Sequence, residues 1–386
     1  MKKVIKAFSE LGTLEFILVS FILWRILITF FALIGVLFLP VGSPFLGGEP
    51  GAYSKTPLLW GWANFDGAHY WAIAKRGYVQ FEQAFFPVYP LVVRVWAKFL
   101  GNLLFSGLLV SHLALLFALY LFYYLMRLDF KKSVARLALI LLLIFPTSFY
   151  FGSFYTESFF LALILASFYA ARKKSWFWAG MIGAFASATR LAGIFLLPAL
   201  VVEFYLQAKK TKTKFHLKDF LSLLLIPLGL GIYIFYLWRT TGDPLYFFHV
   251  QPFFGAERSG GKIILLYQVF WRYLKMIFTT PFNHTYFIVW LELVSFVSFF
   301  AALILALFNR KVRFSYTVFG FCLLLLPTLT GTLSSVPRYV LPIFPGFIVF
   351  ALYGRKMRFL KWGYFLISLV LSAVCVMFFI RGYWIS

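Results

Sequence analysis

The feature that most constrains this chain is a series of about eleven apolar windows, several of them short, separated by polar connections. A helix needs roughly 20 mostly apolar residues to cross a bilayer. Only 12% of the residues are charged, against about 25% in soluble proteins, and the mean hydropathy is +0.89. The sequence therefore predicts an all-α polytopic membrane protein with about eleven transmembrane helices in one domain over residues 1–386. The windows are residues 16–39, 104–126, 137–152, 157–171, 176–190, 191–207, 220–238, 284–308, 315–333, 339–353 and 363–380.

The formal net charge of +24 comes from Lys and Arg residues that cluster in the short connections. With eleven spans, every cluster falls on one side of the membrane, which is the bias expected of cytoplasmic loops. We therefore predict a cytoplasmic N-terminus and an extracytoplasmic C-terminus, and this distribution argues against nucleic-acid binding. The first apolar run has the length of a span and no small-residue cleavage site, which indicates an anchored helix. The clusters are Lys2, Lys3 and Lys6; Arg127, Lys131, Lys132 and Arg136; and residues 172–174, 209–218, 310–313 and 355–361.

The same topology places two longer segments outside the membrane, residues 40–103 and residues 239–283. Residues 40–59 are rich in Gly and Pro, which predicts a connection dominated by helix breakers. Residues 262–281 include Lys262, Arg272 and Lys275. We therefore expect an interfacial or re-entrant helix there instead of a clean span.

Residues 60–75 of the first outer segment have helical spacing and carry Asp66, a carboxylate in a chain with only 12 acidic residues. We expect the chemistry of the protein here. If this helix lies along the outer leaflet, its aromatic residues sit at headgroup level while Asp66 faces a cavity. After Gly77, Pro87 and Pro90 break one helix and open the next. One face of the first helix would carry Asp66, His69, Tyr70 and Ile73, and its headgroup aromatics would be Trp62, Phe65 and Trp71.

Short motifs follow one another along the chain in a specific order. The first outer segment contains Phe65-Asp66-Gly67-Ala68-His69-Tyr70, Ile73-Ala74, Gly77-Tyr78, and Ala84-Phe85-Phe86-Pro87 with Tyr89-Pro90-Leu91. Later motifs are Pro146-Thr147-Ser148 with Tyr155-Thr156-Glu157-Ser158, Ala179-Gly180, Thr189-Arg190 and Gly193, Gly242-Asp243-Pro244 with Gln251, and Arg338-Tyr339 with Phe344-Pro345. Together they resemble the GPI mannosyltransferase 2 (PIG-V-like) family over roughly residues 60–345. The family usually has Arg-Trp before the Asp, where this chain has Asn64-Phe65.

The resemblance implies a GT-C glycosyltransferase that moves a sugar, mannose in this family, from a polyprenyl-phosphate donor to a hydroxyl on the extracytoplasmic face. The acceptor would be lipid-linked or a glycan. Inverting transfer needs a base for the attacking hydroxyl and cationic or hydrogen-bonding groups for the departing phosphate. We assign Asp66 as the base. We expect no cofactor and no metal, because His112, His216 and His284 lack metal-ligand spacing and Cys322 and Cys375 lie in apolar spans.

Four further ionisable residues are candidates for the site. His69 is predicted to orient Asp66 or to contact the donor phosphate. Glu157 is a carboxylate in an apolar region, where such groups are costly and often functional, so we predict a second acidic or acceptor-side residue. Arg190 and Arg338 are expected to hold the lipid phosphate, because guanidinium groups match phosphate oxygens bidentately. The plainer alternatives are helix-start acids, an interfacial histidine and snorkelling arginines.

Five residues are candidates to contact sugar hydroxyls or sugar rings. Three are aromatics near Asp66 and two are polar residues of the second outer segment. The plainer alternatives are that the aromatics pack or face lipid and that the polar residues are solvated. The candidates are Tyr70, Phe86, Tyr89, His249 and Gln251.

A lipid-glycan transporter or flippase is the main alternative, because ionisable residues in membrane spans also line transport pathways. Transporters tend to contain repeated halves with paired broken helices, and this chain shows no convincing internal repeat. A noncatalytic scaffold leaves the acid-bearing outer segment unexplained. Short loops favour a prokaryotic plasma membrane, and in a eukaryote the same topology would indicate the endoplasmic reticulum.

Overall fold

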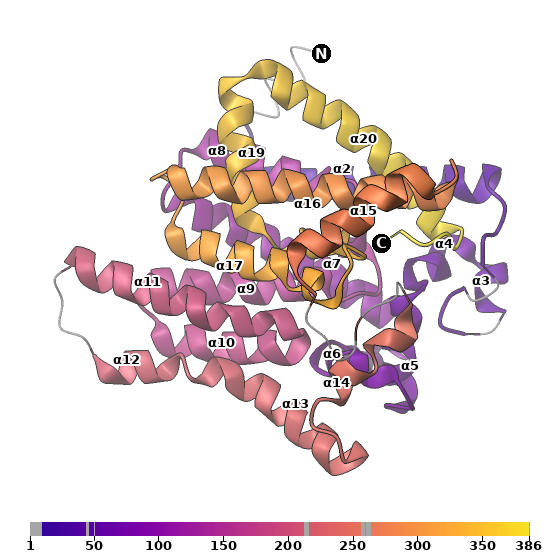
Figure 1. Ribbon diagram of the computed structural model, residues 1–386, viewed down its shortest axis with the longest axis horizontal. Coiled ribbons are helices and arrows are strands. Elements are labelled where there is room, and N and C mark those ends of the chain that lie inside the picture. The colour runs from indigo at the N-terminus through magenta and orange to yellow at the C-terminus, as the bar shows by residue number, and fades with distance from the viewer. Residues whose placement is uncertain are drawn as a thin grey trace.

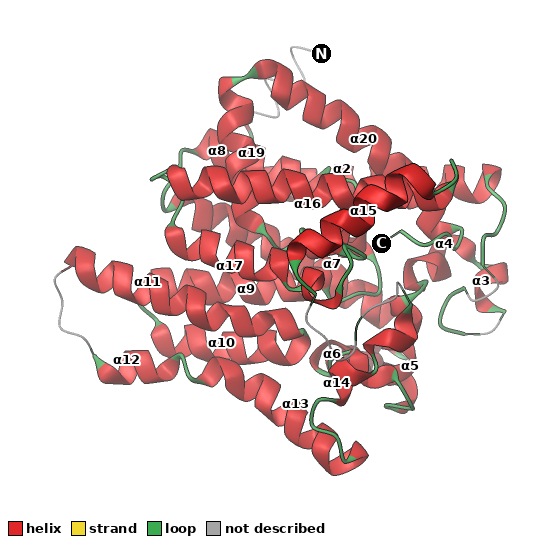
Figure 2. Ribbon diagram, in the orientation of Figure 1, coloured by secondary structure: helices red, strands yellow, loops and turns green. Residues whose placement is uncertain are grey.

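The computed structural model describes residues 10–43, 46–49, 51–211, 216–255, 259 and 264–385. These residues form helices and no strands, as Figure 2 shows, so the all-α prediction is confirmed. Four predicted basic residues, Lys2, Lys3, Lys6 and Lys262, lie outside the described residues, as do residues 212–215 of the 209–218 cluster.

Six helical segments of the described chain are long and apolar enough to cross a membrane, and each coincides with a predicted window. In Figure 1 several of them run side by side through the body of the molecule. They are α2 (Thr13–Phe38), α7 (Leu103–Arg127), η4 (Leu191–Phe195) with α11 (Leu196–Thr211), α12 (Leu217–Ser222) with α13 (Leu225–Thr241), α16 (His284–Phe308) and α20 (Arg358–Ile380).

Five shorter helices occupy the remaining windows, so the count of eleven spans stays a prediction. They are α8 (Lys132–Leu143), α9 (Glu157–Arg172), α10 (Trp176–Thr189), α17 (Phe314–Leu325) and α19 (Phe344–Lys356). Proline interrupts two windows because it lacks the backbone N–H that continues a helix. α8 ends before Pro146 and is followed by η3 (Ser148–Gly152), and α17 ends before Pro327, where η6 (Pro327–Thr330) begins.

The first outer segment folds into short helical elements, so the single helix expected over residues 60–75 is wrong. It breaks at Asn64 and Phe65, where the Gly67 N–H donates to the Asn64 C=O over 3.1 Å. Phe65 has φ +55° there, a region that L residues rarely occupy. The break makes Asp66 the first residue of a helix. The elements are α3 (Ala52–Lys55), α4 (Pro57–Trp60), η1 (Gly61–Ala63), α5 (Asp66–Arg76), η2 (Glu82–Ala84) and α6 (Val88–Leu100).

The second outer segment contains α14 (Tyr246–His249), η5 (Gln251–Phe254) and α15 (Leu266–Thr279), and α18 (Val336–Tyr339) lies further along the chain. The 14 residues of α15 measure about 21 Å, too short for a span. α15 contacts α16 and lies across it in Figure 1. The helix expected within residues 262–281 is therefore confirmed, and its placement in the membrane interface stays a prediction. Four large apolar side chains repeat along its exposed face: Tyr267, Trp271, Leu274 and Phe278.

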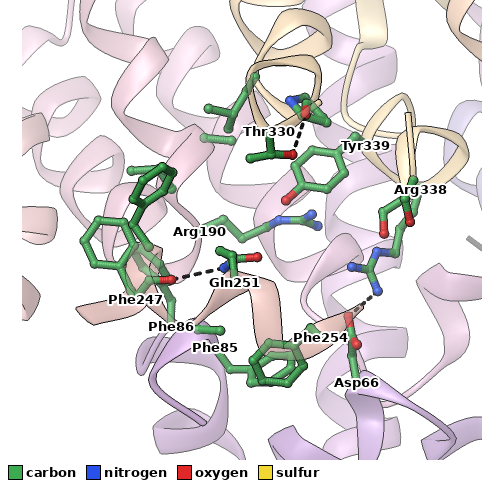
Figure 3. Close-up of a pocket in the computed structure, with 18 of the residues that line it drawn as sticks. Asp66, Phe85, Phe86, Arg190, Phe247, Gln251, Phe254, Thr330, Arg338 and Tyr339 are labelled. Carbon is green, nitrogen blue, oxygen red and sulfur yellow. Dashed lines mark hydrogen bonds and ion pairs between the residues drawn. The ribbon is translucent and has the colours of Figure 1, made fainter. Parts of the chain in front are cut away.

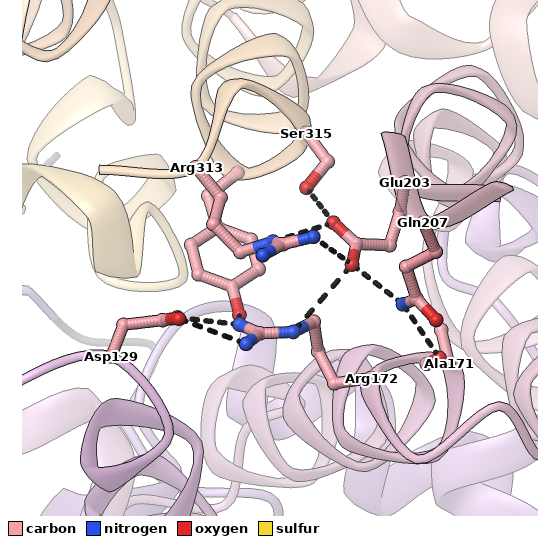
Figure 4. Close-up of polar contacts among 8 residues, drawn as sticks. Asp129, Ala171, Arg172, Glu203, Gln207, Arg313 and Ser315 are labelled. Carbon is pink, nitrogen blue, oxygen red and sulfur yellow. Dashed lines mark hydrogen bonds and ion pairs between the residues drawn. The ribbon is translucent and has the colours of Figure 1, made fainter. Parts of the chain in front are cut away.

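A buried ion network joins three basic connections at the end of the bundle opposite Glu157. Glu203 on α11 is fully buried and accepts two hydrogen bonds from Arg313, 2.9 Å from Nε and 2.6 Å from Nη2 (Figure 4). Arg172 lies 3.5 Å from Glu203 and 2.5 Å from Asp129. Glu157 and Arg172 are the two ends of the 16-residue helix α9, about 24 Å long. The connections near residues 129, 172 and 313 therefore share one end of the molecule.

A glycine lets α10 and α13 approach closely. A Cβ on Gly229 would lie 1.9 Å from the Ala184 carbonyl oxygen, whereas one on Gly231, in the same helix, would meet nothing within 4 Å. We expect Gly229→Ala to destabilise the protein by about 1–3 kcal/mol through overpacking. Gly231→Ala should be neutral or slightly stabilising, since Ala is the better helix former. Thermal unfolding in detergent measures both, and equal midpoints would contradict the packing argument.

Candidate active site

A cavity of about 350 Å³ brings together residues far apart in the chain. α5, residues 84–86, the junction of α10 with η4, residues 247–254, η6 and α18 form its wall, and Trp384 near the C-terminus completes it. Figure 3 shows charged and aromatic side chains from these segments around the space. Among the predicted site residues, the wall includes Asp66, His69, Tyr70, Phe86, Arg190, Gln251 and Arg338.

Asp66 and Arg338 form a close ion pair in this wall. Oδ2 of Asp66 lies 2.5 Å from Nη1 of Arg338, across 272 positions of sequence (Figure 3). The side chain of Asp66 is 17% exposed and that of Arg338 is 10% exposed. Because both side chains are mostly buried, their opposite charges attract each other more strongly than those of an ion pair on the surface.

Glu157 does not line the cavity but contacts both arginines. Its Oε1 accepts a hydrogen bond from Nη1 of Arg190 at 2.8 Å and lies 3.2 Å from Nε of Arg338. Thr156 precedes it at the helix N-cap but makes no capping bond with its side chain. Since buried charges persist only when they are paired, the ion chain Asp66–Arg338–Glu157–Arg190 explains how two arginines stay inside the protein. Neither arginine snorkels at a surface, because both are buried.

Aromatic rings surround the two guanidinium groups. Arg190 lies 4.7 Å from the ring centre of Tyr339, and Figure 3 shows the two side chains together in the cavity. Arg338 lies 5.6 Å from the ring centres of Tyr150 and Tyr155. Such contacts stabilise cations while the rings exclude water. Charge in this cavity is therefore weakly screened.

His69 lies in the cavity wall beside Glu82. Its Nδ1 is 3.8 Å from the Glu82 carboxylate, and its ring stacks on Phe85 with centroids 4.8 Å apart. Burial raises the pKa of Glu82, but hydrogen bonding with His69 and Arg76 outweighs it and the pKa lies below its ordinary value. The contact with Glu82 was not anticipated, and the predicted orienting of Asp66 by His69 stays a prediction.

Two predicted sugar-contacting residues lie away from the cavity wall. Tyr89 is fully buried between α6 and α7, with its hydroxyl 3.2 Å from the Gly107 carbonyl oxygen and 2.9 Å from Ser111 Oγ. His249 is half-exposed and its Nδ1 lies 2.7 Å from Asp243. Tyr89 therefore packs inside the bundle, and His249 makes a local contact in the turn that begins at Gly242. Neither residue is therefore part of the candidate site.

The expected headgroup position of the loop aromatics is wrong for two of them. Trp62 and Trp71 are buried inside the protein. Trp62 packs under the guanidinium of Arg25 at 4.6 Å, and Trp71 lies beside Trp60 with centroids 5.8 Å apart. The segment before Asp66 is therefore held by protein contacts.

Asn64, where this chain departs from the PIG-V-like pattern, anchors the turn before Asp66. It is fully buried, and its Nδ2 donates to the Phe379 carbonyl oxygen at 2.9 Å. Its Oδ1 accepts from the Gly47 N–H at 2.9 Å, and its carbonyl oxygen accepts from Tyr155 at 2.8 Å. These long-range contacts fix the backbone that carries the acid. No sequence spacing indicated that role.

Tyr339, Phe254 and Trp384 also line the cavity, although none of them was a predicted site residue. Tyr339 belongs to the Arg338-Tyr339 motif, which was a usable signal, whereas the other two are aromatics among 86 in the chain, counted from 52 Phe, 22 Tyr and 12 Trp. No group of three or more His, Cys, Asp or Glu side chains arranged to hold a metal occurs among the described residues.

A scan of protein-family models and a search of curated proteins found no match to this chain. Among solved structures, the fold is similar to ArnT from Cupriavidus metallidurans bound to undecaprenyl phosphate, with a TM-score of 0.53 and 16% identity. That alignment covers 92% of this chain and 63% of the ArnT chain, so this chain spans less than two thirds of ArnT. The Archaeoglobus fulgidus oligosaccharyltransferase aligns with a TM-score of 0.41 and 13% identity over 92% of this chain and 53% of that chain. The likeness to ArnT shows a GT-C-type fold. The six long apolar helices of the described residues support a multi-pass integral membrane protein.

Proposed function

We propose that the protein is an inverting glycosyltransferase that moves a sugar from a polyprenyl-phosphate donor to a hydroxyl of a lipid-linked or glycan acceptor. The observation that carries this proposal is the meeting of Asp66, Arg190 and Arg338 in one cavity wall. A base and two fixed cations are the groups that displacement of a sugar from a phosphate requires. ArnT, which shares the fold, is bound to undecaprenyl phosphate in its crystal structure.

The reaction follows from these three groups. The acceptor oxygen forms a bond to the anomeric carbon, and its proton passes to the Asp66 carboxylate. The bond from the anomeric carbon to the phosphate oxygen breaks, and its electron pair leaves with the polyprenyl phosphate. Arg190 and Arg338 stabilise the negative charge that develops on that phosphate. Glu157 positions both arginines.

The basic connections indicate on which side of the membrane the cavity opens. The ion network through Glu203 brings three of them to the end of the bundle opposite Glu157. Cytoplasmic loops are enriched in Lys and Arg, so the cavity would open on the extracytoplasmic side, of the plasma membrane in a prokaryote or of the endoplasmic reticulum in a eukaryote. Mannose as the sugar is proposed from the PIG-V-like resemblance of residues 65–70, 155–158 and 338–339.

Turnover in detergent tests the function. Purified protein is incubated with radiolabelled polyprenyl-phosphate mannose and a panel of glycolipid acceptors, and released or transferred sugar is counted. Transfer or hydrolysis supports a glycosyltransferase. A transporter has no reaction to catalyse when no membrane divides two compartments. Failure to transfer or hydrolyse this donor, and other polyprenyl-phosphate sugars tested in the same way, would favour the transporter alternative.

Arg190 has a separate expected effect on the donor. Arg190→Gln should raise the KM for the donor at least about tenfold, because a charge-assisted hydrogen bond contributes roughly 1.5–3 kcal/mol. Arg190→Lys keeps the charge and the partner for Glu157, so we expect a smaller increase. Arg239→Gln, at an exposed site on α13, is the matched control and should leave the KM unchanged. An unchanged KM in folded Arg190→Gln would remove Arg190 from phosphate binding.

A further inference from the structure

A second cavity, of about 330 Å³, adjoins the candidate active site and is formed mainly by α15, α16 and residues 332–334. The two cavities share Phe254, Ser334 and Trp384 in their walls. Its volume falls in the range of about 300–1,000 Å³ typical of small-molecule sites. A ligand in this cavity would therefore lie next to a substrate in the first one.

The polar groups of this second cavity come from three segments: α15, α16 and residues 332–334. Glu292 lies on α16 and is buried, although α16 is one of the helices apolar enough to cross a membrane. Tyr273 on α15 donates its hydroxyl hydrogen to Glu292 Oε2. Arg272 lies in the same wall, with the hydroxyls of Thr332 and Ser334. A carboxylate at such a position is costly and marks a functional site by default.

The lining indicates the chemistry of the ligand. Glu292 and Arg272 balance one another in charge, so the cavity favours a neutral ligand over a phosphate or a cation. Carboxylate, guanidinium and hydroxyl groups together both accept and donate hydrogen bonds, as the hydroxyls of a sugar require. Phe254 and Trp384 add large apolar surfaces against which the C–H face of a sugar ring can pack.

We propose that this cavity is the acceptor subsite and takes a neutral glycosyl unit held by Glu292 and Arg272. The proposal rests on the proposed function. The bound unit presents a hydroxyl toward Asp66 across the shared wall, and that oxygen then attacks the anomeric carbon of the donor as described above. The donor phosphate stays with the arginines of the first cavity.

Glu292 and Tyr273 also have a structural role that the test must separate. The Tyr273 hydroxyl accepts a hydrogen bond from the Leu333 N–H at 3.1 Å, in the turn that leads to α18 and Arg338. Glu292→Gln keeps a carbonyl oxygen that can accept from Tyr273, so this turn should stay in place. The variant removes the negative charge and one strong acceptor of the cavity.

The experiment measures two quantities on the protein in lipid nanodiscs. Binding of methyl α-D-mannopyranoside, a soluble neutral glycoside, is followed by saturation-transfer NMR, and hydrolysis of polyprenyl-phosphate mannose is followed in parallel. Glu292→Gln should raise the Kd for the glycoside at least about tenfold. Donor hydrolysis, which needs no glycosyl acceptor, reports whether the donor site of the variant is intact. Ser295→Ala, one turn along α16, is the matched control and should change neither quantity.

The outcomes separate the two proposals. Donor hydrolysis by a wild type that binds no glycoside saturably, or equal binding by Glu292→Gln, overturns the acceptor subsite and leaves the proposed function standing. Loss of hydrolysis together with unchanged glycoside binding in Glu292→Gln shows that the residue acts through Arg338, which also overturns it. A wild type that neither transfers nor hydrolyses the donor sugar overturns the proposed function, and the glycoside Kd of wild type and Glu292→Gln then shows whether the second cavity binds a sugar at all.

Discussion

Asp66→Asn is expected to lower sugar transfer by at least about a hundredfold, because general-base groups contribute about 10²–10⁴-fold. The amide has the shape of the carboxylate but accepts no proton from the attacking hydroxyl. Donor binding should change little, since Arg190 and Arg338 remain held by Glu157. The loss should therefore appear in kcat. Single-turnover transfer from radiolabelled donor, at saturating donor, measures it.

Asp243→Asn is the matched control for this prediction. Asp243 is also a carboxylate of an outer segment paired with a nitrogen base, His249 at 2.7 Å, but it does not line the cavity. Its variant should transfer sugar at the wild-type rate. If folded Asp66→Asn is as active as the control, Asp66 is structural and Glu157 becomes the next candidate for the base.

Glu203→Ala is expected to destabilise the protein by about 3–5 kcal/mol, the usual effect of removing one partner of a buried ion pair. Besides Arg313, the carboxylate accepts hydrogen bonds from Ser315 at 2.6 Å and Gln207 at 2.7 Å. Without it the Arg313 guanidinium loses both of its hydrogen bonds to α11. Chemical or thermal unfolding in detergent measures the difference.

Glu49→Ala provides the comparison. Glu49 pairs with Lys75 over 3.2 Å, and both side chains are about half exposed; exposed pairs contribute about 0–1 kcal/mol. Glu203→Ala protein that remains folded should keep its activity, because the network lies at the opposite end of α9 from Glu157. Equal midpoints for the two variants would show that the Glu203 network contributes little stability.

Much of the helical framework could be predicted from the chain alone. The window over residues 284–308 coincides with α16, and the windows beginning near residues 16, 104, 157 and 176 match α2, α7, α9 and α10 within a few residues. Hydrophobic burial and backbone hydrogen bonding act locally in such segments, so apolar length is enough to locate a helix. The windows at 137–152 and 315–333 were predicted as uninterrupted, whereas α8 and α17 each end before a proline inside them.

Asp66, Arg190 and Arg338 were also predicted site residues, and the structure places all three in one cavity wall. The motifs that contain these residues predicted that they belong to one site. Only the tertiary structure decided which of them form ion pairs. Asp66 and Arg338 are 272 positions apart, and Glu157 bridges two arginines from separate segments of the chain. No local rule specifies such partners.

The sequence by itself determined the membrane class, the positions of the long apolar helices and the small set of acids and arginines available for chemistry. Only the tertiary structure decided that Phe65 breaks the helix before Asp66, that Tyr89 and His249 lie outside the cavity, and that Glu292 lines a second one. The reason is physical. Helix formation depends on neighbours within a few residues, whereas the environment of a buried side chain depends on segments that meet only when the helices pack.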